Sequence, residues 1–153
     1  MGYPEQMSLS NCLKRKSNAD DTAINLAAAA ASYAGFAVLR PISVKRLLFF
    51  VTTQVTASLT APVVSFLAKP TYGSTNAQTT LGTLTIPTGS VVGTTVYKDI
   101  SDATRLAAGS ELSLNGQTQA VDSGTAAGGG WFGMLWEDAP DADLNNTALV
   151  KSV

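Results

Sequence analysis

The residue types that most often perform catalysis are scarce in this 153-residue chain, which has no histidine and one cysteine, Cys12. The lack of histidine removes the commonest general base and the commonest metal ligand, together with every Ser-His or Cys-His dyad. A single cysteine excludes an intrachain disulfide and a structural zinc site. Cys12 also lies in a polar N-terminal segment, where an activated thiol is not expected.

Carboxylates and glycines offer the remaining possibilities for chemistry. Glu111 and Asp122 would face each other across a hairpin at Asn115-Gly116, but such acids are more typical of a solvated edge than of a glycosidase pair. The run Gly124–Gly130 lacks the Gly-Lys-Ser/Thr ending of a phosphate-binding loop, so we predict a flexible or tightly turning connection. Acidic residues in the C-terminal tail match a calcium-binding loop only weakly, because other residues stand where that loop requires a glycine and a final glutamate. We therefore predict that the protein is not an enzyme and holds no metal or cofactor.

An aromatic segment, Trp131–Trp136, follows the glycines and has the composition of a strand. Alternation places Trp131 on one side of that strand and both Phe132 and Trp136 on the other. If the second side is core, Trp131 remains for a contact surface. Because aromatic side chains are enriched at interfaces, we favour a subunit contact over a sugar-stacking platform.

Charge is sparse and nearly balanced. Charged residues make up 14% of the chain and the net charge is −1, so no overall field attracts nucleic acid or an anionic membrane. Lys69 is the only charged residue between Thr52 and Tyr97. Such a surface is either covered by other copies or a partner, or made soluble by Thr, Ser, Asn and Gln, and composition does not separate these alternatives. Lys45 and Arg46 are expected at an exposed edge or in salt bridges.

Nothing in the sequence predicts a membrane span or a signal peptide. The apolar run Ala23–Leu39 is interrupted by polar residues and is shorter than the about 20 residues that cross a bilayer. The first 17 residues contain no apolar core after a basic start. We expect a soluble protein that is made without export.

The stretch Ile42–Lys69 organises the chain. It contains two runs rich in β-branched and aromatic residues, Val44–Val51 and Val63–Ala68, joined by a segment without a charge. We predict two long strands that form the spine of an antiparallel β domain. Residues 20–34 stay open between a short helix, which alanine favours, and an extended first strand.

Shorter strand patterns follow at even intervals along the chain. Further strands are predicted at Phe36–Arg40, at Thr79–Ile86 with a bulge or close approach at Gly82, and at Thr94–Lys98, Ser110–Leu114, Gln117–Val121 and Trp131–Trp136. Asn115-Gly116 is the strongest hairpin signal, and Leu106 is expected to close one end of the core. About eight short strands indicate an all-β chain, a single β-sandwich or jelly roll. We divide the chain into an N-terminal arm (1–18), a β-sandwich domain (19–137) and a C-terminal tail (138–153).

The order of these segments resembles that of capsid decoration (cement) proteins of tailed bacteriophages, which have a jelly-roll body. The resemblance spans about Pro41 to Glu137 and is carried by PISVKRLLFFVTTQVTA, VSFLAKP, LGTLTIPTGSVVGTTVYKDIS, LAAGSELSLNG and DSGTAAGGGWFGMLWE. It implies a homotrimer on the capsid surface of the virion, assembled in the host cytoplasm, which binds the major capsid protein and stabilises the shell. Neither nucleic acid nor a membrane is an expected partner.

The two ends of the chain are where we expect contacts to the capsid. The candidate docking residues are charged: Lys14, Arg15, Lys16, Glu137, Asp138, Asp141 and Asp143. The N-terminal segment is either a docking arm or a frayed, solvated terminus. Trp131 is the candidate for the subunit interface. The alternative function is a tail-fibre or spike domain that binds a host glycan or receptor, which would need an exposed aromatic side chain with polar neighbours.

Overall fold

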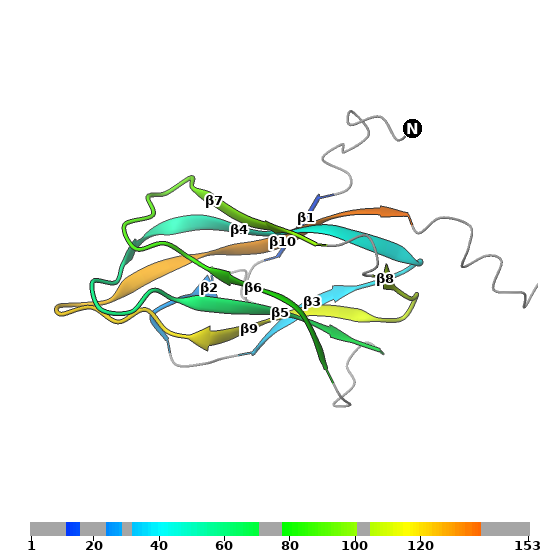
Figure 1. Cartoon of the computed structure of the whole chain (residues 1–153), viewed down its shortest axis with the longest axis horizontal. Coiled ribbons are helices and arrows are strands. Elements are labelled where there is room, and N and C mark those ends of the chain that lie inside the picture. Colours follow the sequence, from blue (N-terminus) through cyan, green and yellow to red (C-terminus); the bar gives the residue numbers. More distant parts are fainter. Residues whose placement is uncertain (1–11, 16–23, 29–31, 71–77, 101–104, 139–153) are drawn as a thin grey trace, which may run out of the picture.

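The chain forms a two-layer β-sandwich in the computed structural model, which describes residues 12–15, 24–28, 32–70, 78–100 and 105–138. These residues form strands and no helix. Two antiparallel sheets lie face to face (Figure 1). The hydrophobic core lies between them. The strands are β1 (Cys12–Arg15), β2 (Ile24–Asn25), β3 (Ser32–Ala37), β4 (Ile42–Thr56), β5 (Val63–Lys69), β6 (Thr79–Thr85), β7 (Thr95–Asp99), β8 (Arg105–Leu106), β9 (Glu111–Thr118) and β10 (Ala127–Asp138). Eight of them have four residues or more, which confirms the predicted sandwich of about eight strands.

The chain passes repeatedly from one sheet to the other. The six-stranded sheet has the order β1-β10-β4-β7, with β2 also paired to β10 and β8 also paired to β4. The four-stranded sheet has the order β3-β9-β5-β6. Among the described strands, β5 and β6 are the one consecutive pair that hydrogen-bond to each other. Most strands that are consecutive in the sequence therefore lie in different sheets instead of pairing.

The two long strands predicted within Ile42–Lys69 are confirmed as β4 and β5, but they lie in different sheets. Each is an interior strand, since β4 lies between β10 and β7, and β5 between β9 and β6. The connection between them crosses the end of the sandwich, where the carbonyl of Pro62 accepts a hydrogen bond from the backbone N–H of Ile86 at 2.9 Å. An interior strand has one face on the core and two covered edges, which suits runs rich in β-branched and aromatic residues.

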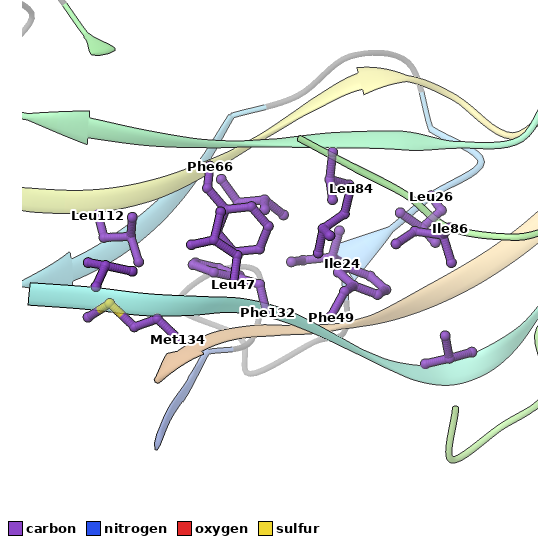
Figure 2. Close-up of a cluster of buried hydrophobic side chains, with 14 of the residues drawn as sticks. Ile24, Leu26, Leu47, Phe49, Phe66, Leu84, Ile86, Leu112, Phe132 and Met134 are labelled. Atoms are coloured by element: carbon purple, nitrogen blue, oxygen red, sulfur yellow. The ribbon is translucent and has the colours of Figure 1, made fainter. Parts of the chain in front are cut away.

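Side chains from both sheets meet in one hydrophobic cluster (Figure 2). Phe49, Phe66 and Phe132 are its largest members, and each is 0% exposed. The rings of Phe66 and Phe132 meet edge to face with their centroids 6.0 Å apart, which joins β5 of one sheet to β10 of the other. Leu106 is also buried in this cluster, as predicted.

The hairpin predicted at Asn115-Gly116 is wrong. Strand β9 continues through both residues, and Asn115 pairs with Ser65 of β5 while Gly116 pairs with Val64. Gly116 does not adopt the positive φ that a two-residue turn of type I′ requires. Because β9 has β3 on one side and β5 on the other, its two ladders of hydrogen bonds outweigh the local turn preference. The separate return strand predicted after this turn is accordingly absent, since its first residues belong to β9.

The connection predicted at Gly124–Gly130 is wrong in its second half, because β10 includes the last three glycines of this run. A Cβ on Gly129 would lie 2.8 Å from the carbonyl oxygen of Ile24. A Cβ on Gly130 would meet the carbonyl oxygen of Phe50 and the ring of Phe49. The glycines therefore serve close packing of β10 against neighbouring backbone and core, and not a turn.

The sequence left residues 20–34 undecided between a short helix and an extended strand. The residues of this segment that the structure describes in strands are extended. Ile24–Asn25 pairs with β10, and β3 begins at Ser32 and ends at Ala37, before the predicted end at Arg40. Ile24 is 1% exposed in the core, so its burial outweighs the helix propensity of the nearby alanines. Residues 20–23 and 29–31 lie outside the described residues.

The irregularity predicted at Gly82 is confirmed. The pairing of β5 with β6 shifts between Phe66–Gly82 and Leu67–Thr80, which leaves Leu81 as an extra residue in β6. A Cβ on Gly82 would lie 3.0 Å from Cδ1 of Leu47 in the opposite sheet. Glycine at this position thus allows the bulge and the close approach of the two sheets.

Asp122 joins the β9–β10 connection to the β4–β5 connection. Its Oδ1 accepts a hydrogen bond from the backbone N–H of Ser58 at 2.8 Å, and its Oδ2 accepts one from Gly124 at 3.2 Å. Hydrogen bonds from Ser58, first from its side chain and then from its backbone, lower the pKa of Asp122 below the ordinary value.

This lowered pKa predicts a pH dependence. Because the folded pKa lies below the unfolded one, the stabilising contribution of Asp122 is present above about pH 4 and is lost as the pH falls through the folded pKa. We expect Ser58→Ala to raise the pKa of Asp122 toward the ordinary value, as measured by NMR titration of its carboxyl carbon. Leu59→Ser, at the exposed neighbour of Ser58, is the control and should leave the pKa of Asp122 lowered. An unchanged pKa at Asp122 in Ser58→Ala would contradict the assignment.

Candidate interaction surface

The outer face of the six-stranded sheet collects aromatic and aliphatic side chains. Phe49 of β4 and Phe132 of β10 point into the core. Because side chains alternate along a strand, the residues next to them point to the outer face of the sheet. Strand register places the following residues together in adjoining rows, and we call this set the aromatic face: Leu48, Phe50, Tyr97, Trp131 and Leu135.

The aromatic face is contiguous and partly open to solvent. Tyr97 is 56% exposed, whereas Phe50, Trp131 and Leu135 are half-buried. Leu48 is 6% exposed although it does not belong to the core cluster, so the centre of this outer face is closely packed. The predicted alternation in β10 is confirmed, since Phe132 lies in the core and Trp131 on the outer face. A contiguous apolar patch of this kind is typical of a protein–protein contact.

A charged group borders the aromatic face at strand β7. Nε of Arg46 lies 2.6 Å from Oδ1 of Asp99, and its guanidinium carbon lies 4.3 Å from the centroid of the Tyr97 ring. The hydrogen bond to Asp99 is the main cause that raises the pKa of Arg46 above its ordinary value. This group ties edge strand β7 to β4 by charge and by a cation–π contact.

The acidic end of β10 is paired with cations of the same chain. Nζ of Lys45 lies 2.6 Å from Oε1 of Glu137, and Nε of Arg40 lies 2.9 Å from Oδ1 of Asp138. The salt bridges predicted as one role for Lys45 and Arg46 are thereby confirmed. Glu137 and Asp138, predicted to dock on a capsid, therefore present ion pairs and not bare acids.

The other predicted docking residues fall at the ends of the chain. Lys14 and Arg15 lie in β1, whose backbone pairs with Gly133 and Phe132 of β10. Part of the predicted arm thus forms an outer strand of the six-stranded sheet. Three docking candidates lie outside the described residues: Lys16, Asp141 and Asp143.

The acid pair considered for catalysis does not form. Glu111 begins β9 and Asp122 follows its end, so the continuous strand separates them. The side chain of Glu111 is 6% exposed, and its Oε1 lies 3.4 Å from Nζ of Lys69, whose side chain is 18% exposed. Glu111 is thus part of a largely buried ion pair between β9 and β5.

We expect Lys69→Met to lower the free energy of unfolding by about 2 kcal/mol, because it leaves a buried carboxylate without this cation while keeping the apolar stem. Adding Glu111→Gln should recover part of the loss, since a neutral amide is buried at lower cost. Urea denaturation of the single and double variants measures both effects. Lys98→Met, at an exposed lysine, is the matched control. Wild-type stability of Lys69→Met would disprove the role of the pair.

Sequence reasoning identified Trp131 but missed the other members of the aromatic face. Alternation around Phe49 would have placed Phe50 on the outer face by the same rule. The pairing of β4 with both β10 and β7, which brings Tyr97 beside this group, has no local signal in the sequence.

Within the described ranges, no group of three or more His, Cys, Asp or Glu side chains is arranged to hold a metal ion. No helix in the part of the chain that the structure describes is long and apolar enough to span a membrane. Comparison with protein-family models, with curated proteins and with solved structures finds no match to this chain.

Proposed function

We propose that this protein is a structural virion protein, a homotrimer that binds the outside of an assembled phage capsid through the major capsid protein and stabilises the shell. The segment order that resembles capsid decoration proteins supports the class of function. The observation that carries the proposal is the aromatic face, which extends over β10, β4 and β7 of the six-stranded sheet.

A jelly-roll topology is part of this proposal. Two sheets with the orders β1-β10-β4-β7 and β3-β9-β5-β6, joined by repeated crossings, correspond to the two four-stranded sheets of a jelly roll. In this assignment β1 and β2 together occupy one strand position beside β10.

The two outer faces of the sandwich differ in character, which favours one of them as the subunit contact. The aromatic face has an apolar centre and a charged border that includes Arg46 and Asp99, the usual anatomy of an interface. The outer face of the four-stranded sheet instead carries hydroxyl side chains, Ser65, Thr83 and Ser113, of which Thr83 is exposed and the two serines are buried.

Stabilisation of a shell follows from mass action. A protein that binds assembled capsid more tightly than its separate subunits lowers the free energy of the assembled state by an amount that grows with the logarithm of its concentration. Catalysis is not needed for this effect.

The proposal is tested by light scattering and by co-sedimentation with empty, undecorated capsids of the phage that encodes the chain. We expect a trimer that binds capsids saturably, and Trp131→Ser should yield a monomer with weakened binding. Leu59→Ser is the matched control, since Leu59 is 68% exposed outside the aromatic face. A wild-type monomer that does not sediment with capsids would overturn the proposal. Deletion of residues 1–11, which leaves β1 intact, tests the docking arm separately.

The second candidate is a tail-fibre or spike domain that binds a host glycan or receptor. Tyr97 favours it, because an exposed aromatic ring beside Arg46 and Asp99 has the polar neighbours that sugar binding needs. A glycan array probed with the wild type and with Tyr97→Ala separates the candidates. Glycan binding that is lost in Tyr97→Ala, from a protein without capsid affinity, would support this function in place of decoration.

A further inference from the structure

A cavity of about 380 Å³ opens where the β3–β4 connection meets the end of β10. Its walls include three buried apolar side chains, Val38, Ile42 and Met134. Because Met134 and Trp136 belong to the core side of β10, this cavity is separate from the aromatic face on the other side of the strand. Leu39 also lines the cavity and is 89% exposed, an unusual exposure for leucine.

One residue that lines the cavity carries a buried hydrogen-bond donor without an acceptor. Trp136 lines it, and the indole Nε1 of Trp136 is the one buried side-chain nitrogen or oxygen of the described residues that lacks a hydrogen-bond partner. Leaving a buried N–H unpaired is unfavourable, and such groups in native proteins call for an explanation. Because this nitrogen is buried, an acceptor oxygen would reach it once the indole ring turns toward the cavity.

A cation lies beside this donor. Arg40 also lines the cavity, with its guanidinium carbon 5.5 Å from the centroid of the Trp136 ring. Its Nε is held by Oδ1 of Asp138 at 2.9 Å, in a pair whose side chains are 62% and 58% exposed. An exposed pair of this kind is weak, so a bound anion can share the guanidinium with Asp138.

We propose that this cavity binds a small amphiphile, an aliphatic chain that ends in a hydrogen-bond acceptor such as a carboxylate. The chain packs against Val38, Ile42 and Met134, and the acceptor oxygen meets the guanidinium of Arg40. A turn of the indole ring of Trp136 brings its N–H to the same oxygen. The volume lies at the lower end of the range for small-ligand sites, which limits the ligand to a short chain. The site does not depend on the proposed virion function.

Octanoate is the probe, measured below its micelle-forming concentration by calorimetry and by fluorescence. The chain has two tryptophans, so in a Trp131→Phe background Trp136 is the sole tryptophan reporter. We expect octanoate to bind and to change the emission of Trp136. Octylammonium has the same chain but no acceptor and a positive charge, and should bind at least about tenfold more weakly.

Two variants locate the site. Trp136→Phe removes the N–H but keeps an aromatic ring, and should weaken octanoate binding about fivefold in calorimetry. Ala37→Phe, at an exposed residue of the cavity lining, should block binding without changing the melting temperature. Trp131→Phe is the matched control and should bind like the wild type. Equal binding of octylammonium, no binding of octanoate, or wild-type affinity in both cavity variants would overturn the proposal.

Discussion

Gly130→Ala is expected to lower the free energy of unfolding by about 3 kcal/mol or more. A Cβ at this position would meet the carbonyl oxygen of Phe50 on the neighbouring strand and the ring of Phe49 in the core. Neither obstacle is a flexible side-chain end, since one is backbone and the other is a fully buried ring. Accommodation would require β10 and β4 to separate, and these two strands hold the centre of the six-stranded sheet.

Urea denaturation followed by circular dichroism measures this loss. Gly124→Ala is the matched control, because a Cβ on Gly124 would have only Oδ2 of Asp122 nearby, at 3.5 Å. We expect the control to change stability by less than about 0.5 kcal/mol. A Gly130→Ala variant as stable as the control would show that β10 and β4 can separate at little cost.

Phe132→Ala is expected to cost about 3–5 kcal/mol of stability, the usual range for a large aromatic side chain removed from a core. Phe132 is 0% exposed and contacts the ring of Phe66 edge to face, so its removal leaves a cavity at the contact between the sheets. Phe132→Leu fills part of that space and should cost less. Chemical denaturation of both variants measures the difference.

The control for Phe132→Ala is Leu59→Ala, at an apolar residue that is 68% exposed. Its effect should stay within about 0.5 kcal/mol, because little apolar area is lost from the interior. A double-mutant cycle with Phe66→Leu and Phe132→Leu isolates the contact between the rings, with an expected coupling of about 1 kcal/mol. No coupling would mean that each ring stabilises its own sheet independently.

Strand β10 contributes residues both to the core and to the aromatic face. Variants on its two sides should therefore differ in whether they lower stability or only self-association. Changes at Gly130 or Phe132 act on folding, whereas Trp131 is half-buried on the opposite face. Loss of self-association in Trp131→Ser with retained stability would therefore report on the interface. Loss of both in Phe132→Ala would report only on unfolding.

Edge strand β7 carries a feature that opposes pairing with a strand of another copy, which favours association of copies through the aromatic face. Lys98 pairs with Leu47, whose side chain lies in the core, and Cδ of Lys98 lies 3.6 Å from the position of a Cβ on Gly82. The lysine stem thus lies on the inner side of an edge strand while the residue remains exposed. Inward-pointing charged residues on edge strands oppose pairing with another chain.

Local patterns in the sequence were sufficient for the fold class and for several elements. The β-branched and aromatic runs Val44–Val51 and Val63–Ala68 lie within β4 and β5, and the alternation of Trp131 and Phe132 matches their two faces. Strand preference and a period of two depend on neighbouring residues, so they are visible in one chain. The break in alternation at Gly82 was visible for the same reason.

Contacts between distant segments decided the rest. Asn115-Gly116 has the local signature of a turn, but β3 and β5 pair with β9 on its two edges and keep it extended. Tyr97 and Phe50 join Trp131 because β4 lies between β7 and β10, a sheet order that no short window of sequence contains. The sequence by itself thus determined the all-β class, the positions of the long apolar strands and the alternation of side chains in the aromatic strand. Only the tertiary structure decided the pairing, the aromatic face and the cavity at Trp136, because each depends on hydrogen bonds and packing between residues far apart in the chain.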